Sequence, residues 1–222
     1  MSLDLSGQEI VSLIFGEKDV LVEYSDGREE RVNFPPGGLK ELRCTHNYLT
    51  TLEGFPKGLE RLICSFNKLT TLEGLPEGLK GLWCYGNRLT TLEGLPRELK
   101  KLQCSDNQLT TLEGLPKGLE KLQCSDNQLI TLEGLPKGLK ELNCSYNRQL
   151  KYIEPSPAEL KIIQVPDHLK EKYSSYSDLR NSFTKYKTLE RRLLSFLVLT
   201  NIGLPTLEIL EKCLDIQFKN SF

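Results

Sequence analysis

Leu99-Lys-Lys-Leu-Gln-Cys-Ser-Asp-Asn-Gln-Leu-Thr-Thr-Leu-Glu-Gly-Leu-Pro-Lys-Gly118 is one of six consecutive stretches of about 20 residues that follow the same pattern. The pattern is Leu-x-x-Leu-x-Cys-x-x-Asn-x-Leu-Thr-Thr-Leu-Glu-Gly-Leu-Pro-x-Gly, and the six units begin at Leu39, Leu59, Leu79, Leu99, Leu119 and Leu139. The sixth unit gains one residue near Arg148, and a partial seventh begins with Leu160, Ile163 and Val165. A fixed period of this length predicts a solenoid, in which each unit stacks on the next.

Each unit predicts a short strand followed by an extended return segment. The stretch Leu-x-x-Leu-x-Cys places apolar residues at alternate positions, which is typical of a strand with one buried face. The second half of the first, second, fourth and fifth units holds two glycines and a proline, such as Gly54, Pro56 and Gly58, and these residues oppose an α-helix there. One unit alone buries too little apolar surface to offset the backbone entropy lost on ordering it, so the units must stack.

One repeat position holds a cysteine in all six units: Cys44, Cys64, Cys84, Cys104, Cys124 and Cys144. Neighbouring parallel strands lie about 4.8 Å apart, which is wider than the usual Cβ separation of about 3.5 to 4.5 Å across a disulfide. Neither His46 nor His168 falls in this column to complete a zinc site. We therefore expect buried, reduced thiols that act as small apolar side chains, and no metal or other cofactor. A disulfide or metal column is the alternative.

Two further columns are polar. The asparagines Asn47, Asn67, Asn87, Asn107, Asn127 and Asn147 stand where each strand turns into its return segment. We expect their amides to bind backbone groups that the turn leaves unpaired. The glutamates Glu53, Glu73, Glu93, Glu113 and Glu133 lie on the return side, where we expect them to be solvated, with a calcium column as the alternative.

The repeat resembles that of leucine-rich-repeat proteins, in the short variety that carries Leu-Pro in the return segment. Similar units occur in bacterial effectors that are injected into host cells, and similar cysteine-containing units occur in proteins of large DNA viruses of amoebae. The resemblance covers residues 39–165. It implies an α/β solenoid, a right-handed superhelix with a parallel β-sheet on its concave face, a protein partner bound to that face, and a role inside a host cell.

The flanks differ from the repeats, so we expect three regions: an N-terminal cap over residues 1–38, the repeats over residues 39–165, and a helical C-terminal cap or module over residues 166–222. Residues 19–34 predict a β-hairpin around Asp26-Gly27. Asp167 and Ser177 are candidate N-caps of helices.

Residues 193–199 are hydrophobic on nearly all sides, which is more than one face of a cap requires. A second partner or self-association through residues 177–218 is therefore an alternative function. Residues 188–210 faintly resemble a SOCS box, which implies an adaptor for a ubiquitin ligase as a further alternative.

Composition limits the classes of function. The chain holds 29 Lys and Arg against 30 Asp and Glu, so no charge excess points to nucleic acid or an anionic membrane. The apolar run at residues 193–199 is shorter than the roughly 20 residues of a membrane span, and the acidic Asp4 and Glu9 do not fit a secretory signal. No catalytic motif appears. We expect a non-enzymatic protein inside a cell, with the cytoplasm of a host cell included.

The residues that vary between units define the candidate binding surface. Aromatic side chains collect on the first three units, and Trp, Tyr and Arg most often dominate the binding energy at protein interfaces. A solvent-facing apolar cluster usually marks an interaction site. The predicted partner-binding residues are Arg43, His46, Tyr48, Ile63, Phe66, Trp83, Tyr85 and Arg88. In the alternative, the N-terminal segment folds over these residues and they are ordinary core. The nearly identical fourth and fifth units are expected to act mainly as spacers.

Overall fold

The computed structural model describes residues 2–34, 38–150, 160 and 162–170. These residues belong to one compact unit, Met1–Leu179. The helices predicted beyond residue 170, and the range 177–218 considered for a second partner, lie outside the described residues.

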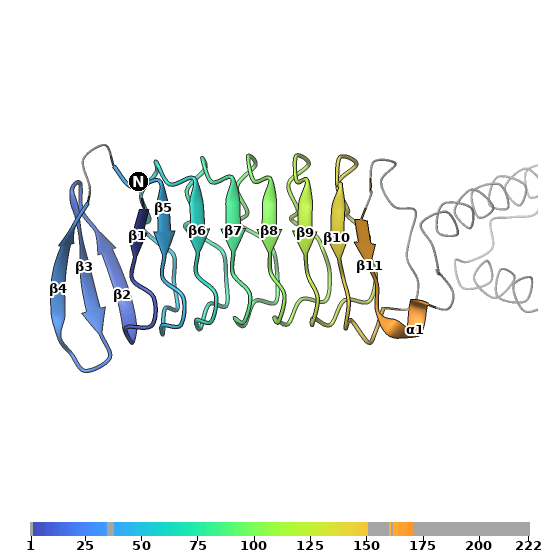
Figure 1. Ribbon diagram of the computed structural model, residues 1–222, viewed down its shortest axis with the longest axis horizontal. Coiled ribbons are helices and arrows are strands. Elements are labelled where there is room, and N and C mark those ends of the chain that lie inside the picture. The colour runs from blue at the N-terminus through green and yellow to red at the C-terminus, as the bar shows by residue number, and fades with distance from the viewer. Residues whose placement is uncertain (1, 35–37, 151–159, 161, 171–222) are drawn as a thin grey trace, which may run out of the picture. The chain divides into compact units, whose positions relative to one another are not determined.

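The repeats form the predicted parallel sheet (Figure 1). One strand of each unit lies beside the strand of the next, in the order β5 (Glu41–Arg43), β6 (Arg61–Ile63), β7 (Gly81–Trp83), β8 (Lys101–Gln103), β9 (Lys121–Gln123), β10 (Glu141–Asn143) and β11 (Ile162–Gln164). The register keeps equivalent residues opposite one another, from Leu42 against Leu62 to Leu142 against Ile163. The partial seventh unit was therefore predicted in the correct register.

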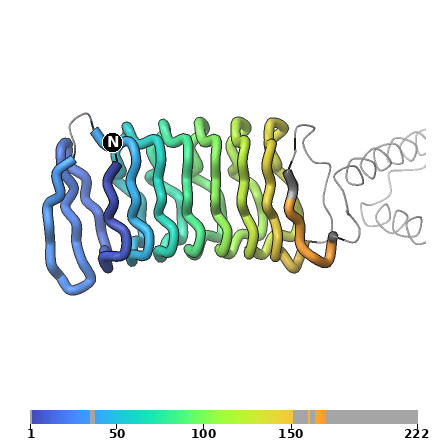
Figure 2. Tube along the Cα trace, viewed as in Figure 1, coloured from blue at the N-terminus to red at the C-terminus, as the bar shows by residue number. Residues whose placement is uncertain are grey.

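The core repeats with the units. In the fourth unit Leu99, Leu102, Cys104, Leu109 and Leu112 are all buried, and the equivalent side chains of the first, second, third and fifth units are buried as well. The described return segments contain no helix, as predicted (Figure 2). Stacking is closest at the return glycines: a Cβ added to Gly94, whose φ is 88°, would lie 2.8 Å from the Leu72 carbonyl oxygen of the preceding unit.

The asparagine column joins consecutive units. The Asn107 amide nitrogen donates to the carbonyl oxygens of Cys104 and, at 3.2 Å, of Cys84 in the preceding unit. Its Oδ1 accepts from the backbone nitrogen of Leu89 at 2.9 Å. Asn67, Asn87, Asn127 and Asn147 repeat this arrangement. The predicted role is confirmed, and it extends to the backbone of the neighbouring unit.

The six column cysteines are buried and free. Four of them donate weak hydrogen bonds to a carbonyl oxygen of the next unit, such as Cys104 to Gln123 at 3.5 Å. Burial raises the pKa of Cys64, Cys104 and Cys144 to about 12. It also raises the pKa of the other three well above the ordinary thiol value.

The charged edges behave differently from the core. The glutamates of the return side are exposed, as predicted. Just before the strands, Glu60 forms ion pairs with Lys40 at 3.1 Å and with Lys80 at 2.9 Å, and Glu120 forms one with Lys140 at 2.8 Å. These pairs join equivalent positions of adjacent units, but their exposure to solvent makes them weak.

The N-terminal residues add a strand to the sheet that the sequence analysis did not predict. Strand β1 (Ser2–Asp4) pairs in parallel with β5, with Leu3 opposite Leu42. Asn47 binds residues 5–10 as the other column asparagines bind the preceding repeat unit. Its Oδ1 accepts from the backbone nitrogens of Gln8 and Ile10, and its amide donates to the Leu5 carbonyl oxygen. Residues 2–10 thus stand in for a repeat unit that lacks both the cysteine and the asparagine.

A small antiparallel sheet follows, made of β2 (Ile10–Phe15), β3 (Asp19–Tyr24) and β4 (Glu29–Asn33). The predicted hairpin is present as β3 and β4, and β2 is a third strand that was not predicted. Phe15 packs against Phe55 of the first repeat unit with ring centroids 4.8 Å apart. This cap sheet therefore continues the apolar core past the first unit.

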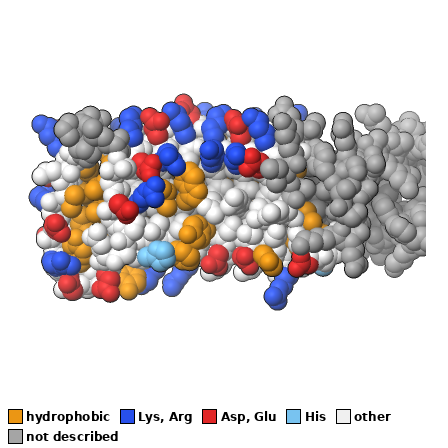
Figure 3. All heavy atoms as spheres, in the orientation of Figure 1, with side chains coloured by type: hydrophobic (Ala, Val, Ile, Leu, Met, Phe, Trp, Pro, Cys, Tyr) orange, Lys and Arg blue, Asp and Glu red, His pale blue; other side chains and the backbone are white. Residues whose placement is uncertain are grey.

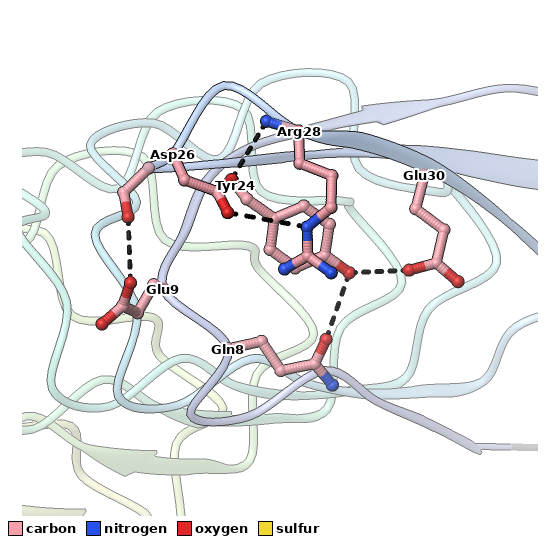
Figure 4. A network of polar contacts seen from close by, with 7 residues as sticks. Gln8, Glu9, Tyr24, Asp26, Arg28 and Glu30 are labelled. Atoms are coloured by element: carbon pink, nitrogen blue, oxygen red, sulfur yellow. Dashed lines mark hydrogen bonds and ion pairs between the residues drawn. The ribbon is translucent and has the colours of Figure 1, made fainter.

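The hairpin turn is tied to the N-terminal segment by a polar network (Figure 4). The Tyr24 hydroxyl lies 3.0 Å from the Glu30 carboxylate and 3.3 Å from Oε1 of Gln8, and Arg28 lies over the Tyr24 ring. Burial, with the hydrogen bond to Glu30, raises the pKa of Tyr24. These side chains bind one another, so we assign the network to the stability of the cap rather than to a binding site.

At the other end of the described residues, a short helix α1 (Asp167–Lys170) begins at the predicted N-cap. His168 Nε2 lies 2.7 Å from the Leu150 carbonyl oxygen. The helix therefore contacts the end of the sixth unit.

We predict that Asn107→Ala lowers the free energy of unfolding by roughly 3 to 5 kcal/mol, because it leaves a buried N–H and buried carbonyl groups without partners at about 1 to 3 kcal/mol each. Gln108→Ala, at the exposed neighbouring position, should change it by less than about 0.5 kcal/mol. Urea denaturation followed by circular dichroism measures both variants. Equal midpoints for the two would contradict the role assigned to the column.

We also predict that the column thiols react with Ellman's reagent at pH 8 only after unfolding, because burial holds their pKa values far above that pH. The measurement uses the Cys213→Ser variant, so that only the six column cysteines are counted. Since their pKa values are raised in the folded state, the contribution of these thiols to stability is fully present below the ordinary thiol pKa of about 9 and is lost as the pH rises toward 12. Rapid labelling of the folded protein would contradict this.

Candidate protein-binding face

The outward residues of the strands, with the turn that follows each strand, form what we call the sheet face. Figure 3 shows hydrophobic side chains gathered over β6 and β7, whereas the middle of the face over β8 and β9 has almost none. The cap sheet does not cover the cluster: Phe66 is 39% exposed, and Ile63, Trp83 and Tyr85 are half-buried. The alternative in which these residues are ordinary core is therefore wrong.

Three of the predicted residues form one ring cluster at the ends of β5 to β7. Phe66 lies between His46 and Tyr85, with ring centroids 4.4 Å from the first and 4.8 Å from the second. The Phe66 ring lies over Gly86 of the next unit, because a Cβ added to Gly86 would stand 2.5 Å from its Cδ1. Any larger residue at position 86 would displace the ring.

Phe66 occupies a strained backbone position. Its φ is 54°, and the equivalent residues His46 and Tyr146 have φ values of 55° and 58°. Other units place Gly86, Asp106 and Asp126 at this position, residue types that enter the left-handed region more readily. The aromatic residues therefore stand where stability would favour Gly or Asp.

Trp83 lies on the same face, at the end of β7, and the position of its ring also depends on a glycine. Its ring lies over Gly81 of its own strand, where a Cβ would stand 2.7 Å from the ring carbon Cζ3. The guanidinium of Arg61 lies 5.4 Å from the ring centroid. Arg61 also pairs with Glu41 at 3.2 Å, and Glu41 pairs with Arg43 at 2.8 Å. The predicted Arg43 therefore belongs to an ion network beside Trp83.

The remaining predicted residues lie at the rim. Tyr48 is 40% exposed, and the Lys68 ammonium nitrogen lies 4.4 Å from the centroid of its ring. Arg88, two residues beyond Gly86, is exposed. Neither Tyr48 nor Arg88 makes a ring contact with the cluster within the described part of the chain. The structure thus brings together His46, Phe66 and Tyr85, with Trp83 and Arg43 nearby on the strands.

Ser65 was not among the predicted site residues. Its side chain is fully buried and its hydroxyl has no hydrogen-bond partner among the described residues. The equivalent hydroxyls Ser105 and Ser125 bind each other at 2.9 Å and are partly exposed. Thr45 and Tyr85 flank Ser65 in its row, whereas Ser105 and Ser125 flank each other, and this difference is the sequence signal that sets Ser65 apart.

The described residues offer little to other kinds of function. No three His, Cys, Asp or Glu side chains among them are grouped so that they could hold a metal ion. No helix in the described ranges is long and apolar enough to cross a membrane.

No protein-family model and no curated protein matches the chain. Among solved structures, the functional domain of InlJ from Listeria monocytogenes, which includes a cysteine ladder, is similar at 30% sequence identity over 58% of this chain and 30% of its own, with a TM-score of 0.46. YopM from Yersinia enterocolitica WA-314 is similar at 25% identity over 60% of this chain and 43% of its own, with a TM-score of 0.33.

The match therefore spans less than half the length of either solved structure. By its own 20-residue repeat, its parallel sheet and its asparagine column, the chain is a leucine-rich-repeat solenoid.

Proposed function

We propose that this protein is a non-enzymatic binding module that holds a protein partner on the sheet face, with the aromatic cluster as the anchor. The observation that carries the proposal is the ring cluster of His46, Phe66 and Tyr85, in which His46 and Phe66 are exposed and have a positive φ. Strained residues collect at functional sites because stability alone selects against them.

The chemistry of the face favours a protein over other partners. Its rings and arginines are the residue types that most often dominate protein interfaces. The near-zero net charge of the chain supplies no general attraction for nucleic acid. The proposed face is the concave one that the leucine-rich-repeat resemblance implies.

The proposed setting is the interior of a cell, with that of a host cell included. The support is the column of six free thiols, because a reducing compartment keeps thiols in this state.

We predict that Phe66→Asp and Trp83→Gln each weaken partner binding at least tenfold, since both remove rings from the anchor. Each change installs the residue that the fourth unit carries at that position, Asp106 or Gln103, so the fold has a precedent for it. Partners captured from extracts of the native host by wild type and variants are compared by quantitative mass spectrometry.

The matched control is Thr110→Ala, an exposed change on the return side. We expect Phe66→Asp to keep the free energy of unfolding to within about 1 kcal/mol, because relief of the left-handed strain offsets the lost ring contacts. Trp83→Gln should cost less than the roughly 3 to 5 kcal/mol of a fully buried Trp. Variants that recover the same partners as wild type would refute the proposal.

A further inference from the structure

We infer that the bound segment of the protein partner is basic, with Lys or Arg side chains that pair with Asp106 and Asp126 beside an apolar residue seated on the Phe66 and Tyr85 rings. This inference rests on the proposed function. It adds the charge of the bound segment and its orientation across the strands of the sheet.

Asp106 and Asp126 stand at the repeat position of Phe66, one and two units beyond Gly86. Both are exposed, and neither forms an ion pair within the described part of the chain. The other acidic side chains of the repeat strands form ion pairs: Glu41 pairs with Arg43 and Arg61, and Glu141 pairs with Lys121 at 2.6 Å. Among the described acids of the repeat strands and their turns, the two aspartates are therefore the ones left for a partner.

The carboxylates are continuous with the aromatic cluster. The Phe66 ring lies over Gly86, and Gly86 donates its backbone N–H to the Ser105 carbonyl oxygen, just before Asp106, at 3.0 Å. Acidic side chains border the hydrophobic patch at the ends of β8 and β9 in Figure 3. A guanidinium or ammonium placed here gains from the face of a ring and from a carboxylate together.

Charge repulsion adds to this preference. Asp126 follows Asp106 at the spacing of adjacent parallel strands, about 4.8 Å, and two like charges at that distance repel. A cation from the partner between or above them removes this repulsion. Glutamine and serine side chains around the pair supply no charge of their own.

The flanking cations set the direction of the partner segment. Lys101 and Lys121 begin the strands on one side of the acidic pair, and Arg88 lies on the other side, in the next row of exposed residues. A basic segment laid along a strand would meet these cations. A segment that crosses the strands, from the rings toward Asp126, avoids them.

A purely structural explanation also exists, because Asp adopts a positive φ more readily than most residues. Asn shares this preference and has nearly the same shape, so Asp106→Asn with Asp126→Asn removes the charge and keeps the backbone. The double variant Glu93→Gln with Glu113→Gln is the matched control, since it removes the same charge from the return side.

The probe is a random dodecapeptide phage library selected on the full chain. We expect the peptides selected on wild type to combine Lys or Arg with an aromatic or large apolar residue. A labelled selected peptide, followed by fluorescence polarisation, should bind about tenfold more weakly to the Asn double variant, with a reduced dependence on salt. The Gln double variant should bind it as wild type does.

The outcomes separate this inference from the proposed function. If Phe66→Asn, which removes the ring without adding a charge, leaves the selected peptides bound at wild-type affinity, the anchor is wrong and the proposed function fails with it. If Phe66→Asn abolishes binding but the Asp106 and Asp126 double variant does not weaken it, or if the selected peptides are neutral or acidic, only the basic chemistry of the partner is overturned.

Discussion

The hydrogen bonds of the asparagine column are the interaction on which the rest of the structure depends. Each repeat strand is only three residues long, so its own pairing with the next strand fixes few backbone groups. At the corner after each strand, one amide binds carbonyl groups of two units and accepts an N–H from the earlier one. Since an unpaired buried group is costly, this arrangement fixes the register of every unit on its neighbour.

That register in turn makes the sheet face possible. Residues at one repeat position fall into straight rows because equivalent leucines stay opposite each other from β5 to β10. The row of His46, Phe66, Gly86 and Asp106 exists only under this condition. The small buried cysteine serves the same end, because it fills the core beneath each strand without pushing neighbouring units apart.

The sequence predicts the repeating part almost completely, since every core position recurs with the period. It fails at β1 and β2 because their place is decided by distant partners. Residues 2–10 share apolar Leu3, Leu5 and Ile10 with a repeat unit, but the asparagine that organises them is Asn47 of the next unit. Strand β2 is held by the contact of Phe15 with Phe55, which no local pattern reveals.

At the candidate site, alternation predicts which residues point outward, with the exception of the buried Ser65, but it does not predict where their rings lie. Phe66 and Trp83 are each placed over a glycine, and Gly86 belongs to a different unit from the ring above it. Ser65 is buried, although the equivalent serines of the fourth and fifth units are partly exposed. These features depend on contacts between rows, which only the assembled sheet defines.

The repeat also supplies an internal comparison for the strained aromatic residues. Units of nearly the same framework place glycine or aspartate at the left-handed position, so the fold has no need of a bulky side chain there. A Phe or Tyr in this conformation carries a cost of roughly 1 to 3 kcal/mol that a Gly or Asp largely avoids. Phe66 offsets part of it through its two ring contacts, but Tyr146 is 62% exposed and makes no ring contact within the described residues. Stability of the isolated solenoid therefore does not account for Tyr146, and its exposed ring is in keeping with the partner contact that we propose for the sheet face.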